Sequence, residues 1–304
     1  MIHHLVISGG GQTGFAFYGI LRESNLQSYW NIENIKSIYS TSVGTIISVI
    51  LCLKYDWETL DNYLINRPWN TIFKLDIYSI IQSFEKRGIF TVDNISQILI
   101  PLFAGKDISY DITLADFYVL NGIDLHFFAT EVNRFNTVDI SHKTHPDWRV
   151  IDAAYCSSTL PIIFAPHIQD DKCFVDGGVM CAYPLKYALD DGVVPEEIFA
   201  LKKYNSLNLS VAVTKQSSLF DYLMIILRQA IQVLNRSDIK TVPNEILIAG
   251  ESVSIDGILE LAASKDSREK LIEFGVELFN NWRCQNPSYV LPLDRVIEES
   301  PHIE

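Results

Sequence analysis

The chain has 304 residues, of which 48% are hydrophobic and 12% aromatic, and its formal net charge at pH 7 is −13. This length and composition are sufficient to bury a sizeable core, and they exclude an intrinsically disordered chain. The negative charge argues against a nucleic-acid partner, which would need a basic surface, and it provides no general attraction to anionic lipid.

The cysteines and the N-terminal region indicate a cytoplasmic protein. The five cysteines are an odd number without metal-type spacing: Cys52, Cys156, Cys173, Cys181 and Cys284. We expect reduced, mostly buried thiols and no metal or other cofactor. The first residues lack the basic region and apolar stretch of a signal peptide, and no run reaches the ~20 apolar residues of a membrane span. The sequence is also compatible with peripheral contact with a membrane surface.

The chain starts with a strand, a glycine loop and a helix. The apolar run Ile2–Ile7 predicts a buried strand, and the apolar spacing of Phe15–Glu23 predicts a helix. Between them lies Gly9-Gly10-Gly11-Gln12-Thr13-Gly14. A glycine loop of this kind points several backbone N–H groups at one place, where they bind an anion or the oxyanion of an acyl-transfer intermediate.

The same loop fits the dinucleotide fingerprint G-x-G-x-x-G through Gly9, Gly11 and Gly14. That fingerprint requires an acidic residue near the end of the second strand, but the second strand here ends in Ser40-Thr41-Ser42. Phe15 stands where a P-loop needs lysine, which excludes that motif. A nucleotide-dependent enzyme is therefore a weaker alternative.

The second strand and the next helix meet at a serine. Ile35–Tyr39 predicts a buried strand, and an apolar run of helical length ends at Leu53. The turn between them, Ser40-Thr41-Ser42-Val43-Gly44, resembles the G-x-S-x-G nucleophile elbow with a serine in place of the first glycine. Such a turn would raise the Ser42 hydroxyl above the sheet, beside the free N–H groups of a helix N-terminus. Taken alone, the pentapeptide also fits a plain turn in which a serine caps the helix.

The rest of the chain alternates helices and strands. Apolar residues at helical spacing predict helices after Pro184 and at Asp56–Asn66, Ile77–Phe84, Val92–Phe103, Thr113–Leu120, Arg149–Cys156, Ser218–Leu234 and Ser264–Trp282. Short apolar runs predict strands at Asp124–Thr130, Thr137–Ile140, Cys173–Asp176, Ile198–Leu201 and Glu245–Ala249. We therefore expect one three-layer α/β/α domain over residues 1–304 with a mostly parallel central sheet. The helices between residues 56 and 103 fit either ordinary packing or a lipid-facing wall over the serine turn.

An acidic residue ends one of these strands at a glycine turn, Asp176-Gly177-Gly178. This position places Asp176 at the C-terminal edge of a strand, where catalytic groups of open α/β sheets collect. An Asx-turn is the structural alternative, because Asp-Gly is a common turn sequence.

The glycine loop, the serine turn and the Asp-Gly-Gly turn occur in the order found in the patatin-like phospholipase family. Members of that family carry G-G-G-x-[KR]-G, G-x-S-x-G and D-G-[GA]. Two further segments are similar to family segments: Ile123–Thr130 to its central strand, and Ser157–Phe164 to its S-x-x-[LI]-P-x-x-F segment. The chain thus resembles this family most strongly over residues 4–190, and residues 191–304 would complete the same domain.

The resemblance implies a lipid or phospholipid acyl hydrolase with a Ser-Asp dyad. Ser42 would be the nucleophile and Asp176 the general base, and the N–H groups of Gly10 and Gly11 would hold the oxyanion. Gly9 and Gly14 would complete this oxyanion hole. The remaining implied site residues support these groups: Ser40 and Gly44 in the elbow, and Gly177 and Gly178 beside the acid.

The order of the histidines disfavours a catalytic triad. In α/β-hydrolases the order is serine, acid, then histidine. His302 is the one histidine that follows Asp176, and it lies near the C-terminus; the others precede the acid: His3, His4, His126, His142, His145 and His167.

Three positions depart from the family pattern. Thr13 replaces a basic residue of the glycine loop, Ser40 replaces the elbow glycine, and Tyr183 stands before Pro184 where the family has asparagine. The alternative function is therefore a relative of low or no activity that binds lipid or protein. The sequence does not predict the head group, the acyl position or the oligomeric state.

Overall fold

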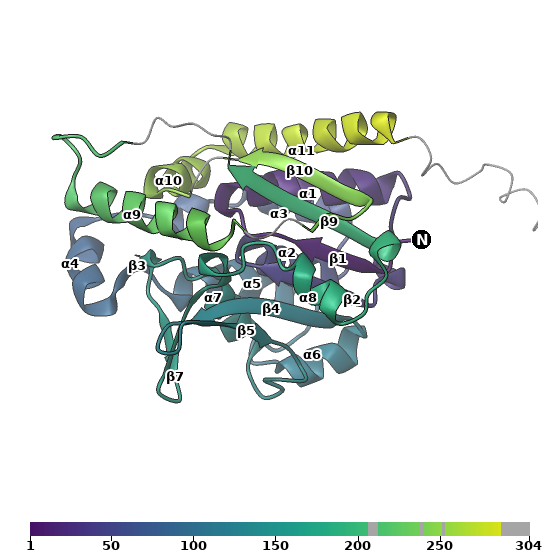
Figure 1. Ribbon diagram of the computed structural model, residues 1–304, viewed down its shortest axis with the longest axis horizontal. Helices are drawn as coiled ribbons and strands as arrows, with labels where there is room; N and C mark the ends of the chain where they lie inside the picture. Colours follow the sequence, from purple (N-terminus) through teal and green to yellow (C-terminus); the bar gives the residue numbers. More distant parts are fainter. Residues whose placement is uncertain (206–211, 237–239, 251–252, 287–304) are drawn as a thin grey trace, which may run out of the picture.

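A computed structural model describes residues 1–205, 212–236, 240–250 and 253–286 (Figure 1). Within them an eight-stranded mixed sheet has the order β10-β9-β1-β2-β4-β8-β7, with β5 also paired to β4. The parallel strands are β1 (His4–Ile7), β2 (Ser37–Thr41), β4 (Asp124–Glu131), β9 (Ile198–Asn205) and β10 (Asn244–Gly250). The antiparallel strands are β5 (Asn136–Ile140), β7 (His167–Gln169) and β8 (Lys172–Asp176). A separate pair is formed by β3 (Gly88–Phe90) and β6 (Ile162–Phe164).

Helices cover the sheet on both faces, which confirms the predicted α/β fold with a mostly parallel sheet (Figure 1). They are α1 (Gly14–Leu26), α2 (Val43–Cys52), α3 (Trp57–Asn66), α4 (Ile77–Lys86), α5 (Val92–Ala104), α6 (Leu114–Asn121), α7 (Val150–Ser158), α8 (Leu185–Asp190), α9 (Leu219–Leu234), α10 (Ile255–Ala263) and α11 (Lys265–Gln285). In the part of the chain that the structure describes, no helix combines the length and apolar character needed to cross a membrane.

The two faces of the sheet bury unequal cores. Alternate residues of a strand point to opposite faces, so Leu5 and Ile7 of β1 join the large core beneath α1, α2, α5, α7 and α11, whereas Val6 joins the smaller one. The smaller core is covered mainly by α8 and the segment leading to it, through Leu185 and Ala188. The third layer of the fold is therefore thin.

The elements that the sequence did not predict are mostly short. Strands β3, β6 and β7 have three residues each, too few for a periodic pattern. The turn between β7 and β8 places Asp170 and Asp171 at φ 51° and 61°, as in a two-residue hairpin turn. The sequence pattern also did not predict helix α10, Ile255–Ala263.

The lengths of β2, β4 and β8 set the geometry of the sheet edge. Strand β4 continues beyond the end of β2, since Thr41 at the end of β2 pairs with Phe128, three residues before β4 ends. Strand β8 pairs antiparallel with this extension, and its last residue, Asp176, lies opposite Ala129. The antiparallel strand β8 therefore ends close to the C-terminal end of the parallel strand β2.

Candidate active site

The turn between β2 and α2 has a strained backbone at its apex. Ser42 adopts φ 56° and ψ −128°, which non-glycine residues rarely adopt. Its N–H donates to the Ser157 hydroxyl at 3.0 Å, and that hydroxyl donates to the Phe128 carbonyl at 2.6 Å. Ser157 therefore ties the apex of the turn to β4. Ser157 belongs to the segment Ser157–Phe164 that is similar to a family segment, but no pattern in the sequence predicts this role for it.

The residues on either side of Ser42 allow the strand and helix to approach closely. A Cβ atom on Gly44 would lie 2.7 Å from the Ile7 carbonyl oxygen, so a side chain there would collide with the backbone of β1. Ser40 is fully buried, and its hydroxyl is 3.0 Å from that of Ser48 on α2. A serine can stand in place of the elbow glycine because the facing helix offers a small hydrogen-bonding partner.

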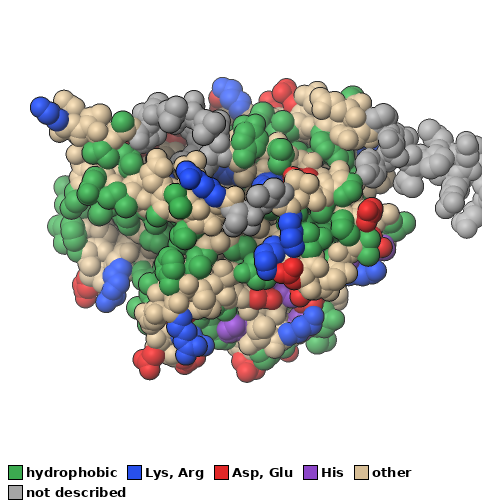
Figure 2. Space-filling model, viewed as in Figure 1, with side chains coloured by type: hydrophobic (Ala, Val, Ile, Leu, Met, Phe, Trp, Pro, Cys, Tyr) green, Lys and Arg blue, Asp and Glu red, His purple; other side chains and the backbone are tan. Residues whose placement is uncertain are grey.

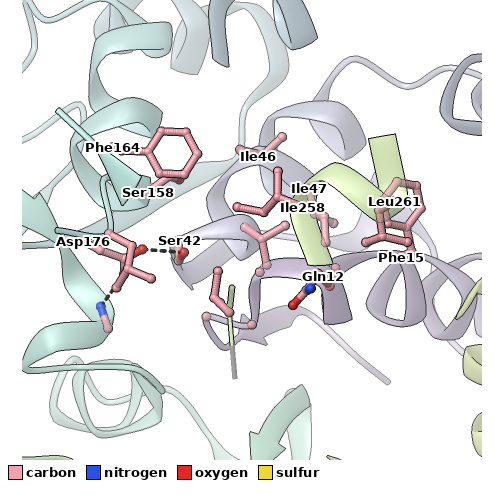
Figure 3. Close-up of a pocket in the computed structure, with 18 of the residues that line it drawn as sticks. Gln12, Phe15, Ser42, Ile46, Ile47, Ser158, Phe164, Asp176, Ile258 and Leu261 are labelled. Carbon is pink, nitrogen blue, oxygen red and sulfur yellow. Dashed lines mark hydrogen bonds between the residues drawn. The ribbon is translucent and has the colours of Figure 1, made fainter. Parts of the chain in front are cut away.

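The side chains of Ser42 and Asp176 meet at this edge (Figure 3). The Ser42 hydroxyl donates to Asp176 Oδ2 at 2.6 Å, and the Gly178 N–H donates to Oδ1 at 2.6 Å. Gly177 gives the turn its close contact with β4, because a Cβ there would lie 2.0 Å from the Phe128 carbonyl oxygen. Both carboxylate oxygens thus have donors, and one of these donors is the serine.

Burial changes the acidity of this carboxyl. The Asp176 residue is 4% exposed, and desolvation raises its pKa to about 6, against the opposing effect of the hydrogen bonds from Ser42 and Gly178. A carboxylate with a raised pKa accepts a proton more readily than an ordinary aspartate, and it is still mostly ionised at neutral pH.

The four glycines of the loop have different hydrogen-bonding states. The Gly9 N–H donates to the Ala182 carbonyl at 2.8 Å, and the Gly14 N–H bonds back to the Gly11 carbonyl. Neither N–H is therefore free for a substrate, which corrects the inclusion of these two residues in the oxyanion hole. Among the described residues, the N–H groups of Gly10 and Gly11 have no acceptor.

Gly9 and Gly14 instead have steric roles. A Cβ on Gly9 would lie 3.2 Å from the Ser42 Cβ, and one on Gly14 would lie 2.4 Å from a methyl of Val43. The loop can therefore lie against the serine turn because these positions lack side chains. Gly11 has φ +53°, a conformation that favours glycine.

A cavity of about 340 Å³ opens over the serine and the loop. Ser42, Asp176 and the glycine loop lie at one side of it, and most of the remaining wall is apolar (Figure 3). Six of these apolar side chains are Phe15, Ile46, Ile47, Phe164, Ile258 and Leu261. The walls match the chemistry of a hydrocarbon chain.

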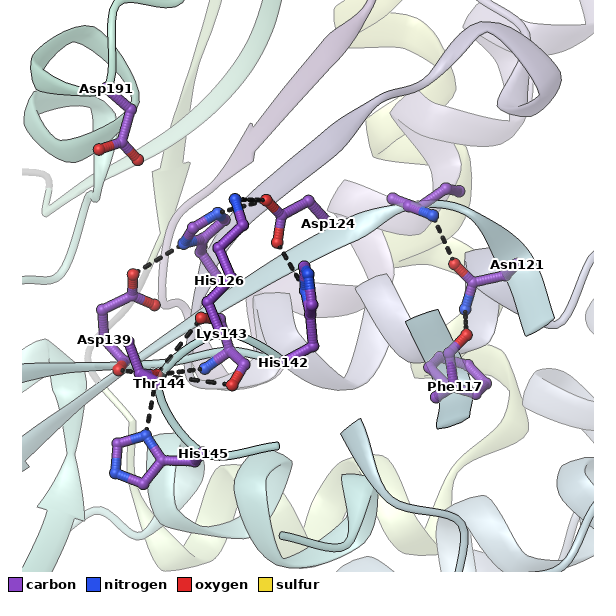
Figure 4. Close-up of polar contacts among 12 residues, drawn as sticks. Phe117, Asn121, Asp124, His126, Asp139, His142, Lys143, Thr144, His145 and Asp191 are labelled. Atoms are coloured by element: carbon purple, nitrogen blue, oxygen red, sulfur yellow. Dashed lines mark hydrogen bonds and ion pairs between the residues drawn. The ribbon is translucent and has the colours of Figure 1, made fainter. Parts of the chain in front are cut away.

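No histidine of the described residues lines this cavity. His126 lies toward the other end of β4, where its ring contacts Asp139 at 2.7 Å and Asp124 at 3.3 Å (Figure 4). Burial alone would lower the pKa of His126, but the two carboxylates outweigh it and raise the pKa to about 9. His126 is therefore an ion-paired structural residue. His302 lies outside the described residues.

The other two departures from the family pattern are also accommodated. Thr13 is buried, and the buried Tyr183 donates its hydroxyl to Glu245 Oε1 at 2.6 Å.

Two basic residues that the sequence did not predict as site residues also line the cavity: Lys203 of β9 and Arg228 of α9. No sequence pattern could have identified them, since both come from elements distant in the chain from the three motifs. Among the described residues, no cluster of His, Cys, Asp and Glu is suited to a metal ion.

Comparisons with known proteins agree with the three motifs. The sequence profile described as "Patatin-like phospholipase" matches residues 5–189. Protein R571 of Acanthamoeba polyphaga mimivirus, described as uncharacterized, is 27% identical over 190 residues. The "Probable lipid hydrolase 463L" of Invertebrate iridescent virus 6 is 25% identical over 185 residues. These alignments cover 62% and 61% of this chain and 62% of each relative, so the chain matches about three-fifths of their length.

The fold also has a counterpart among solved structures. VipD from Legionella pneumophila superposes with a TM-score of 0.52 at 15% identity, over 93% of this chain and 67% of that one. At this identity the likeness concerns the fold alone. Because the family profile matches more than half of the chain, including the glycine loop, the serine turn and the Asp-Gly-Gly turn, this chain belongs to the patatin-like phospholipase family.

Proposed function

We propose that this protein is a serine lipid acyl hydrolase that uses Ser42 and Asp176 as a catalytic dyad. The observation that carries the proposal is the 2.6 Å hydrogen bond between these side chains at one side of an apolar cavity. The name of the iridescent-virus relative, a probable lipid hydrolase, supports the same chemistry. The apolar wall would hold the acyl chain of the substrate.

The proposed reaction has two halves. Asp176 accepts the Ser42 proton while Oγ attacks the acyl carbonyl, and the N–H groups of Gly10 and Gly11 stabilise the resulting oxyanion by roughly 3–4 kcal/mol per donor. The protonated Asp176 then gives its proton to the alcohol as the ester C–O bond breaks, leaving an acyl-serine. A water attacks this ester, Asp176 takes the water proton, and the fatty acid leaves as Ser42 is reprotonated.

We also propose that helix α4 contacts the membrane surface that contains the substrate. Its apolar residues Ile77, Ile80, Ile81 and Phe84 repeat at helical spacing, yet none of the ten residues of α4 is buried. Hydrophobic side chains gather at the same end of the molecule, where α4 and α9 lie (Figures 1 and 2).

The charges around α4 suit a bilayer surface. Although the whole chain carries −13, the segment 74–87 has three exposed cations against two exposed carboxylates. The cations are Lys74, Lys86 and Arg87, and the carboxylates are Asp76 and Glu85. An amphipathic helix with basic residues beside its apolar face can lie in the head-group region, with its cations at the phosphates.

The dyad is tested by a fluorophosphonate probe, which labels an activated serine. We expect wild-type protein to be labelled at Ser42 alone and to hydrolyse a phospholipid or a short-chain ester. Ser42→Ala should abolish both labelling and hydrolysis, and Asp176→Asn should reduce hydrolysis at least a thousandfold with the fold intact by circular dichroism. Wild-type protein that neither reacts nor hydrolyses would favour a non-catalytic relative, and labelling of another serine would refute the assignment.

The pH profile tests which group is the base. Asp176 must be ionised to accept a proton, and burial raises its pKa to about 6. We therefore expect kcat/KM on a soluble ester to be level above this pH and to fall towards tenfold per pH unit below it. Circular dichroism across the same range is the control for unfolding. A decline centred near pH 7 or above would instead indicate a histidine.

Ser157→Ala tests the support of the serine turn. The change leaves the Ser42 N–H without its acceptor, so the turn should lose definition and kcat should fall about tenfold with little change in KM. Ser24→Ala is the matched control, because Ser24 is equally buried and hydrogen-bonded to backbone, at Ile20, away from the cavity. Equal kcat values for both variants and wild type would contradict the positioning role.

Membrane contact is tested by vesicle sedimentation. Phe84→Ser should weaken partitioning onto phosphatidylglycerol-containing vesicles about tenfold, because burying a phenylalanine side chain is worth roughly 1.5–3 kcal/mol. Val119→Ser on α6 is the control, since both side chains are 83% exposed. Hydrolysis of a soluble ester should be unchanged in both. Equal vesicle binding by the two variants would show that α4 does not contact the bilayer.

A further inference from the structure

An asparagine at the end of α9 binds the segment that follows the acid. Asn235 is the C-cap residue of α9, and its side chain contacts residues 177–182, here called the acid segment. Its Oδ1 accepts from the Ala182 N–H at 2.7 Å. Its Nδ2 donates to the Gly178 carbonyl at 3.0 Å and to the Val179 carbonyl at 3.3 Å. One amide therefore connects both ends of the acid segment to a helix that lies much later in the chain.

The acid segment orients the proposed base. The Gly178 N–H donates to Asp176 Oδ1 at 2.6 Å, and the carbonyl of the same residue accepts from Asn235. Gly177 and Gly178 lack the side chains that would restrict their backbone, so the direction of the Gly178 N–H depends on what binds its neighbouring atoms. Asn235 is thus one residue removed from the carboxylate on its Oδ1 side, whereas Ser42 binds Oδ2.

The acid segment also contacts the serine turn and the glycine loop. The Cys181 carbonyl accepts at 3.0 Å from the hydroxyl of Thr41, the residue before the nucleophile. The Ala182 carbonyl accepts from the Gly9 N–H at 2.8 Å, and the Ala182 N–H is the group that donates to Asn235. A displacement of the acid segment would therefore change contacts of all three motifs.

Helix α9 supports this amide and also forms part of the cavity wall. Its residues Met224, Leu227 and Ile231 line the cavity, whereas Asn235 does not. The helix packs on the short turn η4 (Gly177–Val179), with which the acid segment begins. Asn235 therefore lies outside the cavity, where it can act on the base through the backbone but does not meet a substrate.

We propose that Asn235 is a positioning residue for the Ser42–Asp176 dyad, because it fixes the Gly178 peptide whose N–H orients Asp176. The arrangement of the base then depends on the contact between α9 and the acid segment. This inference rests on the proposed acyl-hydrolase function and adds a residue that lies outside the three motifs. Asn235 takes no part in proton transfer.

The experiment measures Asn235→Ala on a soluble ester. We expect kcat to fall about 10- to 100-fold with little change in KM, because the base is misplaced while the cavity is kept. The hydrogen bond from Gly178 lowers the pKa of Asp176, so its weakening should raise that pKa. The acid limb of kcat/KM should therefore move to higher pH, by roughly half a unit to one unit. The rate of fluorophosphonate labelling at Ser42 should fall together with kcat.

Asn121→Ala is the matched control. Asn121 ends helix α6, donates to the Phe117 carbonyl four residues back at 2.6 Å and accepts from the Ile123 N–H at 2.7 Å, away from the cavity (Figure 4). Asn235 likewise donates to the Ile231 carbonyl four residues back, at 2.9 Å. Asn121→Ala should keep the wild-type kcat, KM and acid limb.

Asn235→Asp separates the two ends of the amide. An aspartate has the same size and still accepts from the Ala182 N–H, but it places a carboxylate oxygen against the carbonyls of Gly178 and Val179. We expect it to lose at least as much kcat as Asn235→Ala, with both variants folded by circular dichroism. Wild-type kcat in Asn235→Asp would show that the two donated hydrogen bonds are not needed, which would overturn the inference.

Hydrogen–deuterium exchange of residues 177–182 gives a readout that needs no substrate. Exchange should be faster in Asn235→Ala than in wild type or Asn121→Ala, and equal exchange in all three would overturn the inference. A raised KM with wild-type kcat and an unmoved acid limb would show that Asn235 merely anchors α9 as a cavity wall, which also overturns it while the dyad stands. Wild-type protein without activity on a soluble ester would overturn the proposed function and the inference with it.

Discussion

The hydrogen bond between Ser42 and Asp176 depends on the unequal lengths of neighbouring strands. Because β4 continues past the end of β2, an antiparallel strand can pair with its extension and end beside the serine turn. Were β8 paired along the whole length of β4, its last residue would lie at the opposite edge of the sheet. The strand register therefore decides whether serine and acid meet, and burial of the carboxylate in this corner raises its pKa.

The serine turn is held by contacts from several parts of the chain. Its positive-φ apex is tied to β4 through Ser157, and its flanks are small enough for β1 and α2 to approach one another. A strained backbone conformation persists where the surrounding structure fixes it, and here the strained residue, Ser42, lines the cavity. The same close packing makes Gly9 a contact residue of Ser42 and leaves the next two glycines of the loop as N–H donors.

The positions that depart from the family pattern are compensated locally. Ser40 is paired with Ser48, and Tyr183 is paired with Glu245. Thr13 lies beside Gly250, which the side chain of Lys203 also contacts. These substitutions change the partners of each position and leave the serine, the acid and the loop in contact with one cavity.

The sequence by itself determined the order of most elements, the serine turn, the glycine loop and the acid turn, because each is local chemistry: apolar periodicity, small residues at tight turns and an acid before glycine. It could not determine that Gly9 and Gly14 use their N–H groups internally, since their acceptors depend on how the loop folds. It also could not place Ser157 against the serine turn or Arg228 at the cavity, because both positions come from contacts between distant segments. Only tertiary packing decided these, because the environment of a hydrogen-bonding group or a charge is set by neighbours in space.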